Sequence, residues 1–240
     1  MRVLCALLFL GMASAKENSE SGWGMALELS RSLVGACADM KVGGLAVDVG
    51  ARGGTETRMA LRSNFSTITV ECSRAAAELI KAEHNNTQGR SVWADVHWAC
   101  ASDKTGTATL YEASDSSSLH ARAVEGDQER RKFKKSGNAK SEVPLVVLDD
   151  LLDARSEPLC AVKVDTQGND FAVLRGMKRA LGRHRPVLYF EHSVKMLGNV
   201  KAAKFLPWVR GHGYHCFPRT CLDCHVICTP DRTRAGMAAV

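Results

Sequence analysis

The stretch that decides the fold is Leu45-Ala46-Val47-Asp48-Val49-Gly50-Ala51-Arg52-Gly53-Gly54. Its first half places four apolar residues around one Asp, which predicts a short buried strand of a parallel sheet. Its second half is rich in glycine, which tolerates positive φ and lets a ligand approach the main chain. Residues 55–61 then predict the first turns of a helix, with Thr55 as its N-cap. This order of strand, turn and helix is typical of a nucleotide-sized pocket at the carboxyl end of a sheet.

A second apolar run, Thr67-Ile68-Thr69-Val70, ends in Glu71. An acid about twenty residues after a glycine turn, at the tip of the second strand, is where nucleotide folds hold the ribose hydroxyls. A glycine-rich turn alone is common and unspecific. Together, the turn and the spaced acid predict a nucleoside cofactor.

The glycine turn also bears on which cofactor binds. A dinucleotide site uses G-x-G-x-x-G because the pyrophosphate must approach the second glycine. Here Asp48 stands in place of the first glycine and gives D-x-G-x-x-G. A negative charge favours a cofactor that carries an amino acid and a sulfonium instead of phosphates, so S-adenosylmethionine fits better than NAD.

Further strands and helices alternate along the chain. Residues 91–94, 106–111, 143–148, 160–164 and 186–192 predict strands, and residues 23–37 and 74–83 predict amphipathic helices, the first packed over the sheet edge. Asp165 and Glu191 stand at or near the tips of the last two of these strands, where open α/β sheets bind ligands. The expected fold is therefore an α/β, doubly wound, mostly parallel sheet of the Rossmann-like kind. Residues 214–217 and 225–228 predict a terminal antiparallel hairpin.

Five segments in this order resemble the FkbM-type methyltransferases. They are V-D-V-G-A-R-G-G from Val47, V-E-C-S from Val70, V-P-L-V-V-L-D-D-L-L from Val143, K-V-D-T-Q-G-N-D-F-A-V-L-R-G from Lys163 and P-V-L-Y-F-E-H from Pro186. The resemblance implies a class I fold, S-adenosylmethionine as cofactor, and O-methylation of a sugar or small-metabolite hydroxyl. The sequence departs from the family at Cys72, where Pro is usual, and at Gln167, where Glu is frequent.

The expected site follows from these positions. The cofactor-binding candidates are Asp48, Gly50, Ala51, Gly53, Glu71, Cys72 and Asp95. For the adenine, Asp95 is one of three alternatives, the others being His97 and the segment 99–101. The catalytic candidates are Asp165, Glu191 and His192, because an alcohol acceptor must lose a proton and histidine titrates near neutral pH. Asp165 could equally brace a loop, and His192 could be an ordinary core histidine. No metal ion is expected.

The N-terminal residues predict an export route. Met1-Arg2, the apolar run 3–12 and Ala13-Ser14-Ala15 together resemble a secretory signal peptide over residues 1–15. A helical lead would follow over 16–44, the methyltransferase-like domain over 45–229 and a loose tail over 230–240. The chain is then expected in the secretory pathway lumen or outside the cell, without a membrane span. The net charge of +6 and aromatic content of 6% carry no sign of a nucleic-acid groove.

Two segments inside the domain stand apart. Residues 114–142 are polar and charged, which indicates either a solvated mobile insertion or a loop over the acceptor site. Residues 212–228 hold four Cys and three His. Disulfides, a zinc site or free thiols are each compatible with that spacing.

Two functions remain open at this stage. The first is a luminal O-methyltransferase that acts on a hydroxylated small molecule or a glycan. The second is a secreted binding protein that keeps the fold without catalysis, a possibility that the departures at Cys72 and Gln167 favour.

Overall fold

The computed structural model describes residues 19–34, 37, 44–84, 91–112, 117–119, 140–220 and 222–231. The first half of the chain forms α2 (Ser19–Leu33), β1 (Leu45–Val49), α3 (Thr55–Arg62), β2 (Ser66–Glu71), α4 (Arg74–His84), β3 (Ala94–Trp98), β4 (Cys100–Ser102), β5 (Gly106–Glu112) and β6 (Ser117–Ser118). The second half forms β7 (Lys140–Val147), α6 (Leu148–Leu152), β8 (Leu159–Val164), α7 (Asp170–Arg175), α8 (Lys178–His184), β9 (Val187–Ser193), α9 (Val194–Leu197), α10 (Asn199–Gly211), β10 (Tyr214–Phe217) and β11 (Asp223–Pro230).

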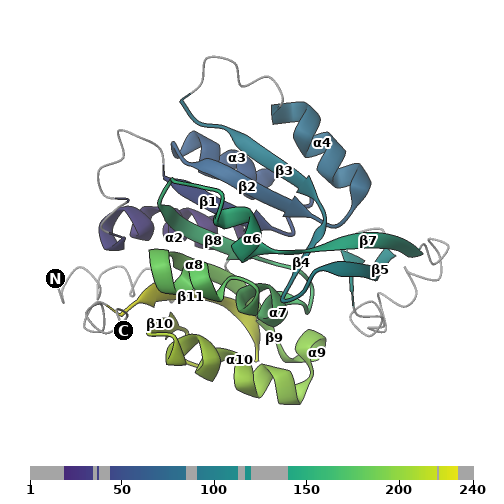
Figure 1. The fold of residues 1–240 in the computed structure, drawn as a ribbon. Helices are drawn as coiled ribbons and strands as arrows, with labels where there is room; N and C mark the ends of the chain where they lie inside the picture. The colour runs from purple at the N-terminus through teal and green to yellow at the C-terminus, as the bar shows by residue number, and fades with distance from the viewer. Residues whose placement is uncertain are drawn as a thin grey trace.

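The main sheet has seven strands in the order β10-β11-β9-β8-β1-β2-β3. The neighbouring strands from β9 to β3 pair in parallel. At the other edge, β11 is antiparallel to β9, and β10 is antiparallel to β11. Figure 1 shows helices on both sides of this sheet. The predicted doubly wound α/β fold with an antiparallel end is therefore confirmed.

The two faces of the sheet bury different helices because successive strand residues point to opposite sides. Val47 and Val49 of β1 pack into one core with residues of α6, α7, α8 and α10. Ala46, the residue before Val47, packs into the other core with residues of α2 and α3. Every residue of β1, β2 and β8 is buried, as a parallel sheet covered on both faces requires.

A second, smaller sheet of order β4-β7-β5-β6 stands beside the carboxyl end of the main sheet (Figure 1). The strands expected at 106–111 and 143–148 are present as β5 and β7, yet they pair with each other and not with the main sheet. The alternation of small and apolar residues predicted a strand there, but it could not specify its partner. A small core of Cys100, Leu110, Val143 and Leu145 holds this sheet together.

The third strand lies later than expected. The sequence favoured residues 91–94, whereas β3 spans Ala94–Trp98 and pairs with β2. Every residue of β3 is only half-buried, so the strand lacks the continuous apolar run that marks the central strands. Edge strands give this weak signal because one of their sides faces solvent.

Helix α2 covers the face of the sheet over β8, β9 and β11, and the expectation that it packs over the edge is wrong. The helix approaches closely because Gly22 has no side chain: a Cβ there would lie 2.6 Å from the ring of Tyr189. The indole Nε1 of Trp23 donates to the carbonyl of Glu56 at 3.0 Å. A disulfide between Cys37 and Cys160 ties the chain after α2 to β8.

The C-terminal hairpin is present with a shifted register. β10 pairs with residues 227–230 of β11, and Cys216 lies opposite Cys228, to which it is disulfide-bonded. Cys224 is disulfide-bonded as well. Among the described residues no cluster of three or more metal-ligating side chains occurs. The disulfide alternative therefore holds for the Cys216–Cys228 pair.

Several predictions fall on other parts of the chain. The signal peptide, residues 114–116 and 120–139 of the insertion, and residues 232–240 of the tail lie outside the described residues. Within the described part, no helix is both long and apolar enough to cross a membrane.

Candidate functional site

A cavity of about 860 Å³ opens at the carboxyl end of the main sheet. The glycine turn after β1, the end of β2, the start of α4, the end of β8 and the edge of the small sheet all contribute to its walls. Its size is in the range of sites that bind small molecules and cofactors. The position agrees with the sequence-based prediction, because the tips of parallel strands meet at this edge.

The glycine turn is shaped by backbone conformations that other residues adopt poorly. Gly50 has a φ of 76°, and a Cβ there would lie 1.9 Å from the carbonyl oxygen of Asp165. Gly54, also at positive φ, is the N-cap of α3, so Thr55 is the first helical residue and not the cap as predicted. A Cβ on Gly53 would meet nothing within 4 Å. The main chain at Gly53 therefore borders open space in the cavity, where a ligand can approach it.

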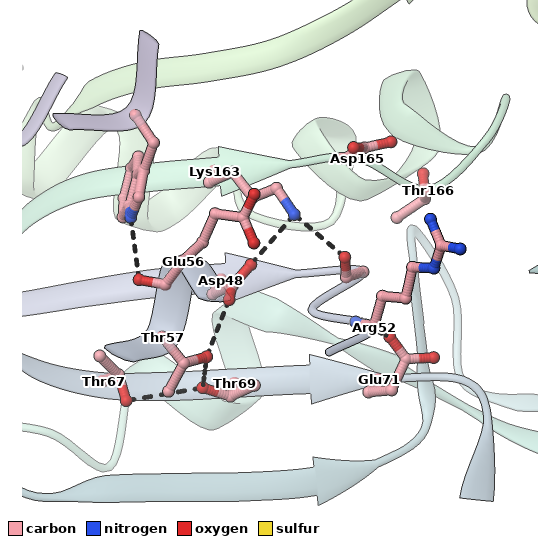
Figure 2. A network of polar contacts seen from close by, with 12 residues as sticks. Asp48, Arg52, Glu56, Thr57, Thr67, Thr69, Glu71, Lys163, Asp165 and Thr166 are labelled. Carbon is pink, nitrogen blue, oxygen red and sulfur yellow. Dashed lines mark hydrogen bonds and ion pairs between the residues drawn. The ribbon is translucent and has the colours of Figure 1, made fainter. Parts of the chain in front are cut away.

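Beneath the turn lies a buried ion pair. Asp48 and Lys163 are direct neighbours on β1 and β8, and their Oδ1 and Nζ atoms are 3.3 Å apart. Lys163 Nζ also donates to the carbonyl of Gly50 at 3.0 Å, and Thr57 Oγ1 donates to Asp48 Oδ2 at 2.8 Å (Figure 2). Both charged side chains are almost fully buried. This pair therefore fixes the turn from below.

Lys163 lines the floor of the cavity, but Asp48 does not. The sequence-based assignment of Asp48 to a direct cofactor contact is therefore unsupported, and its contacts are those of a support for Lys163. Burial by itself lowers the pKa of Lys163, but the attraction of Asp48, Asp165 and Glu56 outweighs it and holds that pKa above its ordinary value. Figure 2 shows the Glu56 side chain turned toward Lys163.

Lys163 was not among the predicted site residues, although the sequence contains a signal for it. A lysine within the buried run Cys160-Ala161-Val162-Lys163-Val164 requires an acidic partner, since an unpaired buried charge is costly. Asp48 lies in an equally apolar run. The two strands had to be placed side by side before this pairing could be recognised.

Glu71 faces the cavity from the tip of β2, as predicted. Its two carboxylate oxygens accept hydrogen bonds from the backbone N–H groups of Arg52 and Ser73, each at 2.7 Å. Burial raises the pKa of Glu71 above its ordinary value, and these two N–H groups act in the opposite direction. A carboxylate can accept about four hydrogen bonds, so each oxygen keeps capacity for a ligand hydroxyl.

The wall beyond Glu71 contains a disulfide. Cys72 and Cys100 are bonded to each other and both line the cavity, followed by Ala101. The segment 99–101 is thus the alternative that reaches the site. Asp95 does not line the cavity, because β3 begins at Ala94 and places it near the strand's amino end, where it pairs with Arg155 and His97.

The loop after β8 begins with Asp165 (Figure 2). Asp165 lines the cavity. Gln167 Nε2 donates to Asp165 Oδ1 at 3.0 Å and to Glu191 Oε2 at 3.3 Å. Gln167 therefore holds the two acids in one group, although Glu191 itself does not line the cavity. Asp165 is the one catalytic candidate with direct access.

The same loop is held from behind by Asp170. Its carboxylate accepts the N–H groups of Thr166 at 3.0 Å and Gly168 at 3.1 Å. Burial and the charge of Asp165 raise the pKa of Asp170 to about 7, against these hydrogen bonds, which lower it. The sequence motif contained Asp170, but its supporting role follows only from the folded loop.

His192 lies away from the cavity. Its side chain is buried beside Phe205, and its Nε2 is 3.2 Å from the carbonyl of Ala202 on α10. Neighbouring strand residues point to opposite faces of a sheet. Glu191 accordingly points toward Gln167, and His192 points toward α10. The position of His192 therefore gives no support to its assignment as a base.

The rim of the cavity contains four residues that the sequence patterns did not predict. Glu112, Ser117, Ser118 and Leu119 line it from the small sheet. Ser118 Oγ donates to the carbonyl of Gln167 at 2.8 Å and joins this rim to the Asp165 loop. These residues lie in or beside the polar segment 114–142, whose composition gave no sign of which of its residues would reach the site.

Charge in the cavity is mostly negative. Four acids line it, namely Glu56, Glu71, Glu112 and Asp165, against the two bases Arg52 and Lys163. Lys163 is already compensated by Asp48. Such a site attracts a cationic ligand and disfavours a pyrophosphate at the glycine turn.

Comparison with solved structures gives matches of low sequence identity. A methyltransferase FkbM from Methylobacillus flagellatus KT is 14% identical with a TM-score of 0.51; the match covers 83% of this chain and 47% of that one. The present chain thus spans about half of that protein. An O-methyltransferase from Bacillus cereus, in complex with SAH, is 12% identical over 96% of this chain and 89% of that one, with a TM-score of 0.49. An rRNA methylase from Streptococcus thermophilus is 9% identical over 91% and 100%, with a TM-score of 0.47.

Sequence comparison adds the family. No curated protein matches the chain significantly. The model of the methyltransferase FkbM domain matches residues 48–216, which contain the glycine turn, Glu71, Lys163 and Asp165. This match extends over more than half of the chain. The protein therefore belongs to the FkbM methyltransferase family.

Proposed function

We propose that the protein is an S-adenosylmethionine-dependent methyltransferase that transfers the methyl group to a hydroxyl of a sugar or small metabolite. The observation that carries the proposal is the environment of Glu71. Its carboxylate is fixed by two backbone N–H groups, faces the cavity and lies next to the glycine turn. This arrangement suits a ribose diol, since two hydroxyl donors can meet the remaining acceptor sites.

The charge of the cavity supports a sulfonium cofactor over a dinucleotide. Glu56 lies in the first turn of α3 and faces the cavity floor. A pyrophosphate at this helix terminus would meet that carboxylate, whereas the ammonium group of an amino acid would be attracted to it. When bound, S-adenosylmethionine supplies a methyl group on a positively charged sulfur for in-line displacement.

The chain's own residues would position the two reactants and exclude water, which is the main task of such a catalyst. The main chain at 50–53 and Glu71 would hold the cofactor. Asp165 is the best-placed acceptor for the hydroxyl proton, and the Gln167 amide would keep its carboxylate in position. The rim residues Glu112 and Ser117 would contact the hydroxylated acceptor.

Titration calorimetry tests the cofactor. We expect S-adenosylmethionine and its demethylated product to bind with micromolar dissociation constants and NAD not to bind. Binding of NAD with comparable affinity would overturn the proposal. A nucleic-acid acceptor is not proposed; methylation of an RNA oligomer, with no transfer to glycans, would contradict the acceptor class.

A second function is favoured by one contact. Gln167 occupies the position where the family often has Glu, and its amide donates to both Asp165 and Glu191. An amide cannot take up a proton, so a secreted binding protein that has lost catalysis is the alternative. Cofactor binding without methyl transfer to any of a panel of sugars and hydroxylated metabolites would favour that alternative.

We also propose that the protein works in the secretory pathway or outside the cell. The disulfides Cys37–Cys160, Cys72–Cys100 and Cys216–Cys228 support an oxidising compartment. Expression of the full chain in cultured cells, followed by N-terminal sequencing, is expected to yield an exported form that begins at Lys16. Retention of Met1 in a cytosolic product would contradict this.

A further inference from the structure

We infer that the Cys72–Cys100 disulfide is the wall against which the purine of the cofactor rests, so that cofactor affinity depends on the oxidation of this pair. The inference rests on the proposed function, because it assumes a nucleoside held by Glu71. It adds a binding element that includes Cys100 and a dependence on redox state.

The expected position of the purine follows from the positions of Glu71 and the glycine turn. In an adenosine, the base is attached to C1′, next to the hydroxyl-bearing C2′, and the amino-acid end is attached through C5′ on the other side of the ring. If Glu71 holds the diol and the glycine turn faces the amino-acid end, the base must lie across Glu71 from the turn. The residues that line the cavity there are Cys72, Cys100 and Ala101.

The residues on this side of the cavity offer the purine few surfaces to rest on. Among the described residues that line the cavity, none is aromatic, so the base has no ring to stack on. The apolar groups that line the cavity on this side are alanines, the exposed Leu79, the disulfide, and Leu119, which packs against the small core that contains Cys100. Sulfur is polarisable and makes favourable contacts with aromatic rings. The disulfide is therefore the best available surface for a purine.

The Cys72–Cys100 disulfide also fixes the shape of this wall. Cys72 follows the last residue of β2, and Cys100 is the first residue of β4, which pairs with β7 in the small sheet. The bond thus joins the two sheets directly beside Glu71. The Cys72 carbonyl also accepts from Trp98 Nε1 at 3.1 Å, and Ala101 accepts from Asn169 Nδ2 at 2.8 Å. Ala99 N–H also donates to the Glu71 carbonyl at 3.1 Å. Cleavage of the bond would leave hydrogen bonds of this kind, and no covalent cross-link, between Cys72 and Cys100.

The redox step is a thiol–disulfide exchange. A dithiol such as dithiothreitol donates two electrons and two protons; the Cys72–Cys100 S–S bond breaks, two thiols form, and the reductant closes to its own cyclic disulfide. Oxidation is the reverse reaction with a disulfide oxidant. In the reduced state the two sulfurs can separate, and the wall loses its fixed shape.

The main experiment measures protection in the unaltered protein. The full-length protein is treated with dithiothreitol, with and without saturating S-adenosylhomocysteine, and each cysteine pair is followed by differential alkylation and mass spectrometry. We expect the nucleoside to slow reduction of Cys72–Cys100 about tenfold and to change that of Cys216–Cys228 by less than about twofold, because the hairpin is remote from the cavity. Equal protection of both pairs, or of neither, would overturn the inference.

A variant gives the second measurement. The double variant Cys72→Ser with Cys100→Ser is expected to bind S-adenosylhomocysteine about tenfold more weakly, and the matched hairpin variant Cys216→Ser with Cys228→Ser to bind within about twofold of wild type. Unchanged affinity in a folded Cys72/Cys100 variant overturns the inference but leaves the proposed function intact. Absence of binding by the oxidised wild-type protein defeats the proposed function itself. Should the variant fail to fold, the protection experiment alone decides.

Discussion

The floor of the cavity and its side wall use buried charge in different ways. On the floor, Asp48 and Lys163 compensate each other, and their hydrogen bonds go to Thr57 and the Gly50 carbonyl. On the wall, Glu71 is held by two backbone N–H groups, faces the cavity and has no cation bonded to it among the described residues. The difference separates a pair that supports the turn from an acid that is open to a ligand. Asp48, near the tip of the first strand, belongs to the supporting pair, whereas Glu71, at the tip of the second strand, is the residue that we propose to bind the cofactor.

Removal of the Lys163 charge from the floor is expected to have the largest effect on the protein. We expect Lys163→Met to lower the free energy of unfolding by about 3–5 kcal/mol, because Asp48 would stay buried without its partner. Urea unfolding followed by circular dichroism measures the loss.

The matched control is the double variant Lys163→Met with Asp48→Asn. It removes both charges and should recover a large part of the lost stability, since the cost comes from an uncompensated charge. A loss below about 1 kcal/mol in the single variant would show that the pair does not support the fold.

A change in the wall should separate binding from stability. We expect Glu71→Ala to weaken S-adenosylhomocysteine binding about tenfold or more, because it removes a charged acceptor for two hydroxyls. The unfolding free energy should change by about 1 kcal/mol or less. The variant loses two hydrogen bonds to backbone N–H groups, but it also no longer pays the cost of burying a carboxylate, and the two effects offset each other. Calorimetry and urea unfolding give the two values.

Glu112→Ala is the control for charge alone. Glu112 also lines the cavity, but it lies on β5 in the small sheet. Its replacement should leave the affinity for the nucleoside within about twofold, as expected for a residue that does not contact it. Equal effects of both substitutions would mean that only the overall charge of the cavity matters.

A titration behind the Asp165 loop tests the third part of the site. Asp170 has a pKa of about 7 in the folded protein against an ordinary value of 3.8. The folded state therefore keeps a proton that the unfolded chain has already released. This group's contribution should make stability fall as pH rises from about 4 to about 7 and then level off.

Comparison with Asp170→Asn isolates that contribution, because the variant cannot titrate at this position. Thermal unfolding at several pH values between 4.5 and 8 should show a downward slope in wild type relative to the variant. Parallel curves for the two proteins would contradict the assignment. Together, these measurements show whether the floor, wall and loop behave as separate parts.

Local patterns in the sequence were sufficient for the elements that are buried on both sides. The runs around Asp48, Ile68 and Val162 predicted parallel strands correctly, since short runs rich in apolar and β-branched residues leave few alternatives. Glu71 and Asp165 were placed at strand tips for the same reason. The strand β3 was shifted by three residues, because its half-buried side chains give no comparable run.

Other features depend on which segments meet in space. The sequence by itself determined the α/β sheet, the glycine turn and the acids at its edge, because these follow from hydrophobic periodicity and from the conformational freedom of glycine. Only the tertiary structure decided that Asp48 pairs with Lys163, that His192 faces α10, and that Cys72 and Cys100 join two sheets. The physical reason is that partner choice is set by strand order and by packing between distant segments, neither of which leaves a local pattern in the chain.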